Sequence, residues 1–188
     1  MKKLNKLSVL ALTSLFILSS CETTELELTS NPNALSPENA SVDLFINNVQ
    51  EDFANFVNSM GDVGARLTRI AQMSGDRMYQ DAYSPNSFSG IWSSAYQGMM
   101  EDLRVMNGIA AENGLTYHIG MGQVMQAYLL MTLVDYFGDV PYTEALLGSE
   151  NLNPAPDSGQ SVYNSAIGLL DSAISNFSGG GPAPQYDM

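Results

Sequence analysis

Three carboxylate residues in one short stretch are the strongest candidates for catalysis in this chain. Asp135 and Glu144 lie on either side of a Gly-Asp-Val-Pro turn, and Asp139 belongs to the turn itself. Hydrolysis of a glycosidic bond requires two carboxyl groups at a defined separation. The same side chains are suited to capping helix ends and turns, because they accept hydrogen bonds from backbone N–H groups. Asp135 lies near a predicted helix end and the other two flank the proline turn, so the sequence favours capping over catalysis.

A single cysteine, Cys21, follows a leader with the composition of a secretory signal. Lysines occupy positions 2, 3 and 6, and an apolar run extends from Leu7 to Leu18. The run is too short for a membrane-spanning helix, which needs about 20 apolar residues. Leu18-Ser19-Ser20-Cys21 resembles the lipobox of bacterial lipoproteins, which implies a signal peptide at 1–20 and lipidation of Cys21. A plain secretory signal with an incidental cysteine is the alternative.

Cleavage before Cys21 makes the chain more acidic. All 20 acidic residues follow the cysteine, whereas the three lysines precede it. The remainder keeps four arginines against 20 acidic residues, a formal charge of −16 compared with −13 for the whole chain. Such a surface repels nucleic acid and anionic lipid headgroups. Membrane attachment is therefore expected to depend on acyl chains.

Aromatic side chains in a loop-like stretch are candidates for ligand binding. Residues 74–90 are rich in Ser, Gly, Asp, Pro and Asn, and they include Tyr79, Tyr83 and Phe88. Exposed rings in loops can pack on the C–H faces of sugars, and an amide such as Asn86 can hydrogen-bond hydroxyl groups. The alternative is that the rings fix the loop to the helices.

Two residue types that occur once have weaker claims to a function. Trp92 can stack on a sugar, but its spacing to Tyr96 and Met99 favours a core position. His118 lacks the partners that a metal site or catalytic pair needs, so a solvated or capping role is expected. Neither a metal site nor a cofactor is expected.

Apolar residues recur at helical spacing in most of the remaining sequence. The pattern predicts helices over 41–60, 63–73, 90–110, 117–137 and 161–177, with a break at Gly61 and a stop at Gly138. The predicted buried faces are Phe45, Val49, Phe53, Phe56, Val57 and Met60; Trp92, Tyr96, Met99, Leu103, Met106 and Ala110; Met121, Val124, Met125, Tyr128, Leu129, Thr132 and Tyr136; and Val162, Ala166, Leu169, Leu170, Ala173 and Phe177.

The chain divides into a polar tether and one helical domain. Residues 21–35 are mostly polar and contain the turn signal Asn31-Pro32-Asn33, whereas residues 36–188 carry the helical patterns. Strand signals are few. The sequence therefore predicts an all-α protein, built as an antiparallel helical array with irregular loops and preceded by the signal peptide and the lipidated tether.

Several segments occur in an order that is typical of one protein family. They are Asn31-Pro32-Asn33 after the cysteine, Trp92 to Tyr96 at a helix start, the run DYFGDVPYTEA from Asp135 to Ala145, and Pro156-Asp157-Ser158 before the last helix. In these segments the chain resembles the SusD/RagB family of nutrient-binding lipoproteins of the outer-membrane surface. Family members are much longer, so the chain resembles the N-terminal part of one.

The resemblance implies a tetratricopeptide-like helical scaffold with a binding role rather than an enzymatic one. Members of the family cap a TonB-dependent barrel transporter of the SusC type and present oligosaccharide, or sometimes peptide, to its pore. The location implied is the outer membrane, lipid-anchored and exposed at the cell surface. A lipid-anchored glycoside hydrolase fragment and a structural envelope lipoprotein are the alternatives. The candidate ligand residues are Tyr79, Tyr83, Asn86 and Trp92, and the expected structural turn is Gly138, Asp139 and Pro141.

Overall fold

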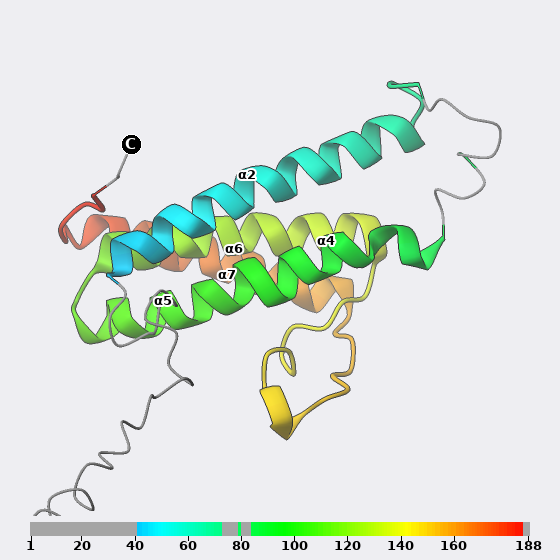
Figure 1. Ribbon diagram of the computed structural model, residues 1–188. Coiled ribbons are helices and arrows are strands. Elements are labelled where there is room, and N and C mark those ends of the chain that lie inside the picture. Colours follow the sequence, from blue (N-terminus) through cyan, green and yellow to red (C-terminus); the bar gives the residue numbers. More distant parts are fainter. Residues whose placement is uncertain (1–40, 73–78, 80–83, 186–188) are drawn as a thin grey trace, which may run out of the picture. The chain divides into compact units, whose positions relative to one another are not determined.

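Helices make up most of the described chain, which comprises residues 41–72, 79 and 84–185 of a computed structural model (Figure 1). Among these residues no strand occurs, and the isolated bridge between Val140 and Asp157 is the β pairing found there. The expected all-α fold is confirmed. The helices are α2 (Val42–Leu67), α4 (Ser89–Ser93), α5 (Glu101–Glu112), α6 (Thr116–Phe137) and α7 (Gly159–Ser178).

Helix α2 is continuous where the sequence predicted two helices. Ser41 caps its start, because the Oγ accepts a hydrogen bond from the N–H of Leu44 at 3.3 Å, and the helix passes through Gly61 without a break. An interior glycine costs a helix only about 1 kcal/mol. The hydroxyl of Tyr136 donates to the carbonyl of Met60 at 2.8 Å, so α6 supports α2 beside the glycine. The break at Gly61 and the separate helix over 63–73 were therefore wrong.

The predicted helix over 90–110 is built from three consecutive pieces. Helix α4 leads into a π-helical segment, Ser94–Met100, and this continues as α5. Met99, Leu103, Met106 and Ala110 are buried as the spacing predicted, while Trp92 and Tyr96 are only half-buried. Wide π turns inside α-helices are rare and often lie at functional sites.

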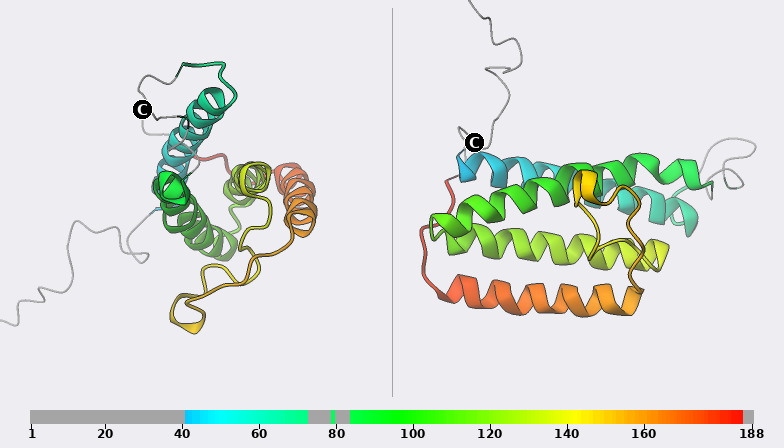
Figure 2. Two further views of the ribbon diagram at one scale, coloured as in Figure 1. Left: turned by 90° about the vertical axis from the view of Figure 1, so that its right-hand side faces the viewer. Right: turned by 90° about the horizontal axis from the view of Figure 1, so that it is seen from below.

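Helix α6 lies between α7 and the α4–α5 helix in both views of Figure 2, with α2 packed on it as well. This central position explains why its predicted buried face was only partly right. Met125 and Leu129 are buried, but Val124, Tyr128 and Tyr136 are 38–46% exposed. Glycines also allow close approach, because a methyl group at Gly120 would lie 2.7 Å from the Phe177 ring. A helix covered on several sides has no single stripe to detect.

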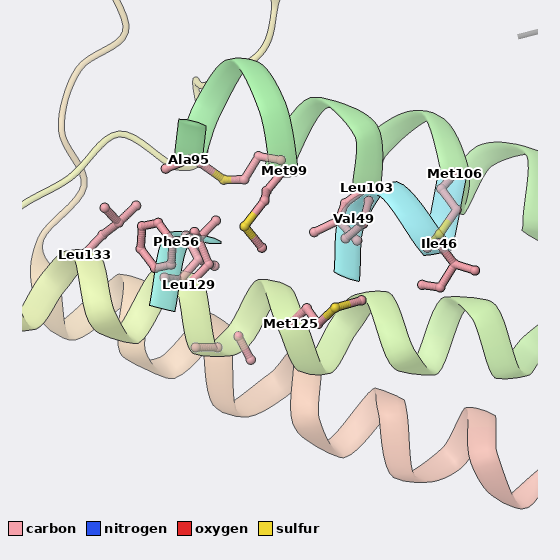
Figure 3. Packing of buried hydrophobic residues seen from close by; sticks show 14 of the residues in the cluster. Ile46, Val49, Phe56, Ala95, Met99, Leu103, Met106, Met125, Leu129 and Leu133 are labelled. Atoms are coloured by element: carbon pink, nitrogen blue, oxygen red, sulfur yellow. The ribbon is translucent and has the colours of Figure 1, made fainter. Parts of the chain in front are cut away.

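The core forms where α2, the π-helical segment, α5 and α6 meet (Figure 3). Unbranched methionines from all four of these elements fill gaps between the branched side chains. Burying each large side chain stabilises the fold by about 2 kcal/mol. The labelled members in Figure 3 are Ile46, Val49 and Phe56 from α2; Ala95, Met99, Leu103 and Met106; and Met125, Leu129 and Leu133 from α6.

Helix α7 runs antiparallel to α6 and carries the C-terminal part of the fold (Figures 1 and 2). Ser158 caps its start by accepting from the N–H of Ser161 at 3.3 Å. Val162, Ala166 and Ala173 are buried, in agreement with the predicted face. Residues 138–158, here called the connector, join α6 to α7 and include a 3₁₀ turn at Gly148–Glu150.

Candidate functional site

The connector starts from a glycine that ends α6. Gly138 has φ 79°, a backbone conformation that favours glycine, and its N–H donates to the carbonyl of Val134 at 2.8 Å. The next residue fixes the following helix, because Asp139 Oδ1 accepts from the N–H of Gly159 at 2.9 Å. A carboxylate two residues beyond α6 thus fixes the first residue of α7.

Asp157 fastens the two arms of the connector to each other. Backbone hydrogen bonds run both ways between Val140 and Asp157, with N···O distances of 3.2 and 3.0 Å. The carboxylate also accepts from the N–H groups of Tyr142 and Thr143, at 2.9 and 2.8 Å, and from the Thr143 hydroxyl at 2.8 Å. The bonds from Thr143 hold the pKa of Asp157 below its usual value, because they favour the ionised form.

The other two carboxylates singled out in the sequence also have protein partners. Glu144 Oε2 accepts from the Asn151 amide at 3.0 Å and from the N–H of Ala155 at 3.1 Å. Asp135 accepts a hydrogen bond from the Tyr163 hydroxyl. Together with Asp139, these side chains hold the connector and helix ends in place, which is the capping chemistry described above rather than a pair of free catalytic groups.

Residues 84–96, here called the aromatic segment, pack against the end of α6. Trp92 stacks on Tyr96 with ring centroids 5.2 Å apart and planes 8° apart. The ring centroid of Phe137 lies 4.9 Å from that of Trp92 and 5.3 Å from that of Phe88. The Tyr96 hydroxyl donates to the carbonyl of Pro141 at 2.7 Å, and its desolvation raises the pKa of Tyr96. The aromatic segment and the connector therefore meet at Tyr96.

The candidate ligand residues occupy different environments. Asn86 is exposed in the 3₁₀ turn Pro85–Phe88, and its carbonyl accepts from the Ser89 hydroxyl at 2.9 Å. Trp92 is half-buried and Tyr79 is half-buried beneath the guanidinium of Arg69, 5.1 Å from its ring centroid. Tyr83 and the lipidation candidate Cys21 lie outside the described residues.

Sequence reasoning missed the role of Phe137, whose ring packs against the aromatic segment. The sequence placed it only at the end of a helix, yet its ring lies between Phe88 and Trp92. A cluster of this kind joins residues that are distant in the chain, and periodicity within one helix carries no information about such contacts. The signal that could have pointed to it is an aromatic residue directly before a helix-ending glycine.

His118 is buried, which corrects the expected solvated or capping role. Only 3% of it is exposed, and its Nε2 lies 2.8 Å from Asp43 Oδ1. The N–H of Gln185 donates to the same carboxylate oxygen at 3.0 Å. The bond with His118 is the main reason that the pKa of Asp43 is lowered. These contacts join the starts of α2 and α6 to the C-terminal stretch, because all three segments converge on one carboxylate.

The described residues hold no group of three His, Cys, Asp or Glu side chains placed to bind a metal ion. None of the described helices combines the length and the apolar character needed to cross a bilayer.

Comparisons with known proteins give the chain a family. A family model described as "Starch-binding associating with outer membrane" matches residues 32–188. A crystal structure of a SusD/RagB family protein from Bacteroides thetaiotaomicron is similar in fold, with a TM-score of 0.63 and 22% identity, over 79% of this chain and 32% of that one. The chain thus spans about a third of that protein's length. No curated protein sequence matches it.

The family match extends over the tether's end, every described helix and the connector, so it does not depend on one motif. The similar crystal structure independently shows the same helical fold. The chain therefore belongs to the SusD/RagB family, whose SusD-like model is described as starch-binding and associated with the outer membrane.

Proposed function

We propose that this protein is a lipid-anchored protein of the bacterial cell surface that binds oligosaccharide and delivers it to a SusC-like TonB-dependent transporter. The observation that carries the proposal is the family match over residues 32–188, with its description as starch-binding. Peptide is the alternative ligand. The aromatic segment supplies a surface suited to sugars, because half-buried rings lie beside exposed polar groups such as the Asn86 amide.

Binding to glycans tests the proposal directly. Isothermal titration of the full chain with maltohexaose and with a peptide mixture is expected to give heat with the sugar. Asn86→Ala is expected to weaken the affinity by about fivefold if the amide contacts ligand. Asn164→Ala is the matched control, since Asn164 is an exposed asparagine on α7, and it should leave the affinity unchanged. Heat with peptide alone would replace the glycan assignment.

Lipid attachment is tested separately. Growing bacteria that express the chain are labelled with an alkyne fatty acid, and the label is expected in the membrane fraction with the wild type but not with Cys21→Ser. Protease treatment of whole cells should then degrade the wild-type protein at the surface. An unlabelled protein recovered from the soluble fraction would contradict the anchor. Co-purification of a TonB-dependent barrel from the same cells tests the transporter partner.

The hydrolase alternative has less support, because its candidate carboxylates bind the protein's own N–H and O–H groups. We expect that the wild type does not hydrolyse chromogenic glycosides and that the variants Asp139→Asn and Glu144→Gln do not hydrolyse them either. Hydrolysis that disappears with either substitution would favour the enzyme. A chain that binds neither glycan nor peptide but stays in the envelope would favour the structural role.

A further inference from the structure

Two adjoining cavities lie between α5, the π-helical segment and the connector. Their volumes are about 530 and 620 Å³, and both are lined by Arg104 and Leu146. Gln126 of α6 and Tyr142 line the first cavity, and Tyr96 lines the second. We propose that this cleft is a second saccharide subsite, which binds a neutral oligosaccharide and adjoins the aromatic segment at Tyr96.

The walls of the cleft match the chemistry of a sugar. Among its polar groups, the amide of Gln126 can both donate to and accept from hydroxyl groups, and Asn107 adds a second amide to the wall. Its apolar groups, Met100 and Leu146, together with the Tyr142 ring, offer surfaces for C–H faces. A concave site with apolar walls and a few convergent polar groups is the usual form of a small-ligand site.

The charge of the cleft favours a neutral ligand over an anionic one. Arg104 Nε donates to Glu101 Oε2 at 2.9 Å, so the guanidinium is already balanced by a carboxylate. Glu150 adds a further acidic group to the second cavity. The chain as a whole carries a formal charge of −13, which repels anions. Hydroxyl groups, in contrast, can bond the free edges of both members of the Arg104–Glu101 pair.

One polar atom in the wall lacks a hydrogen-bond partner among the described residues. Asn107 Oδ1 is buried, yet nothing in the described part of the chain donates to it. A buried acceptor without a donor is costly, and such atoms in native structures commonly have a specific reason. Asn107 lines the first cavity, but this oxygen lies against α6, where a Cβ on Gly122 would be 3.2 Å from it, so the amide offers the cavity its nitrogen rather than this acceptor.

The wall that the two cavities share is strained but firmly held. Leu146 has φ 62°, in the left-handed region that a side chain disfavours. Its neighbours are held by hydrogen bonds. The N–H of Ala145 donates to the carbonyl of Tyr142 at 3.2 Å, and the Glu144 carboxylate accepts from the Asn151 amide and from the N–H of Ala155. Strained backbone held in place by its surroundings recurs at ligand clamps. A wall that is ordered in advance also loses little entropy when a ligand binds.

The inference rests on the proposed glycan-binding function, and the test separates the two. The full chain, labelled at its methionine methyl groups, is titrated with maltohexaose, cellohexaose and xylohexaose and followed by NMR and calorimetry. The Met100 methyl signal is expected to shift with the sugar that binds, whereas that of Met60, which is buried in the core and lines neither cavity, should not.

Variants locate the binding. Arg104→Met and Gln126→Met, which keep most of the side-chain volume, are each expected to weaken affinity by about fivefold. Arg66→Met is the matched control, because Arg66 is a partly exposed arginine that is likewise paired with a carboxylate of its own helix, and the affinity of this variant should stay within about twofold of the wild type. Thermal melts check that all variants fold.

Two outcomes would overturn the subsite. In the first, Trp92→Ala abolishes sugar binding, while both cleft variants keep the wild-type affinity and the Met100 methyl signal does not shift. This result would reject the cleft and leave the proposed function standing. Failure of all three sugars to bind the wild type would reject the cleft and the glycan-binding proposal together.

Discussion

The connector and the aromatic segment meet at the end of α6, but they are held in place by different forces. The connector is fixed by carboxylates, since Asp139, Glu144 and Asp157 each accept from backbone N–H groups. The aromatic segment is held mainly by ring contacts with Phe137. Hydrogen bonds fix direction as well as distance, whereas ring packing tolerates small shifts. The connector is therefore suited to set an angle between helices, whereas the aromatic segment can shift slightly on the end of α6.

Phe137→Ala is expected to give the largest effect, because this ring supports both Phe88 and Trp92. Loss of a half-buried phenylalanine should cost about 3 kcal/mol of unfolding free energy, measured by urea denaturation. Emission from Trp92, the only tryptophan, should also shift to longer wavelength as the ring gains solvent. Phe177→Ala is the control, since it removes a ring that packs on Tyr117 and should leave the emission unchanged. Unchanged emission in Phe137→Ala would contradict the ring-packing explanation.

Asp157→Ala tests the connector. Three accepted hydrogen bonds are lost, and the half-buried N–H of Tyr142 is left without its partner. We expect a loss of about 2 kcal/mol in unfolding free energy, less than three fully buried bonds would give because solvent reaches the carboxylate. Asp171→Ala, at an exposed position of α7, should change stability by less than about 0.5 kcal/mol. Equal effects for the two substitutions would show that the connector does not depend on Asp157.

Acid should remove the stabilisation that the Asp157 carboxylate gives to the connector. The folded state lowers the pKa of Asp157 from the usual 3.8, so its stabilisation is present above that value and is lost as the pH falls through the lower folded-state value. The difference in unfolding free energy between wild type and Asp157→Ala is therefore expected to be constant near neutral pH and to shrink in strong acid. Other acidic groups are common to both proteins. A difference that grows with acid would refute the sign of this effect.

Tyr96→Phe separates the two regions, because Tyr96 belongs to both. The substitution keeps the stacking on Trp92 but removes the hydrogen bond to the carbonyl of Pro141. We expect a loss of about 1 kcal/mol with little change in tryptophan emission. Tyr163→Phe, which loses an exposed bond to Asp135, should have a smaller effect. A large emission change in Tyr96→Phe would mean that the hydroxyl, rather than the ring, positions Trp92.

Gly61→Ala should have the smallest effect and the opposite sign. Gly61 is an exposed residue inside α2, nearer its end than its start, with open space where a Cβ would lie, so alanine is expected to stabilise the protein by about 0.5–1 kcal/mol. Gly64→Ala is the contrast, since its Cβ would overlap the Tyr136 hydroxyl. Because both glycines lie outside the connector and the aromatic segment, the melting temperatures of these two variants show how large a stability change unrelated to either region is. A lower melting temperature for Gly61→Ala would indicate a real hinge there.

The sequence predicted the helices better than the contacts between them. Periodic apolar residues identified α5 and α7 and the buried positions Leu103 and Ala166, since one face of each helix is covered. The break at Gly61 failed because tertiary contacts from α6 outweigh the small cost of a glycine. The burial of His118 was missed because its partner Asp43 is 75 residues away. The Trp92–Phe137 contact and the Asp157 hydrogen bonds likewise depend on how distant segments fold together.

The wide turns at Ser94–Met100 also affect how the chain tolerates a change in its length. A π turn closes its hydrogen bonds one residue later than an α turn does. Removal of one residue there can therefore be absorbed as ordinary α-helix. Since the wide turns hold about one residue more than ordinary α turns do over the same rotation, such a deletion would leave Trp92 facing Phe137 and keep Leu103 and Met106 seated against α6. A one-residue deletion is thus expected to be tolerated better in this stretch than in α5, where the regular helix has no extra residue to lose.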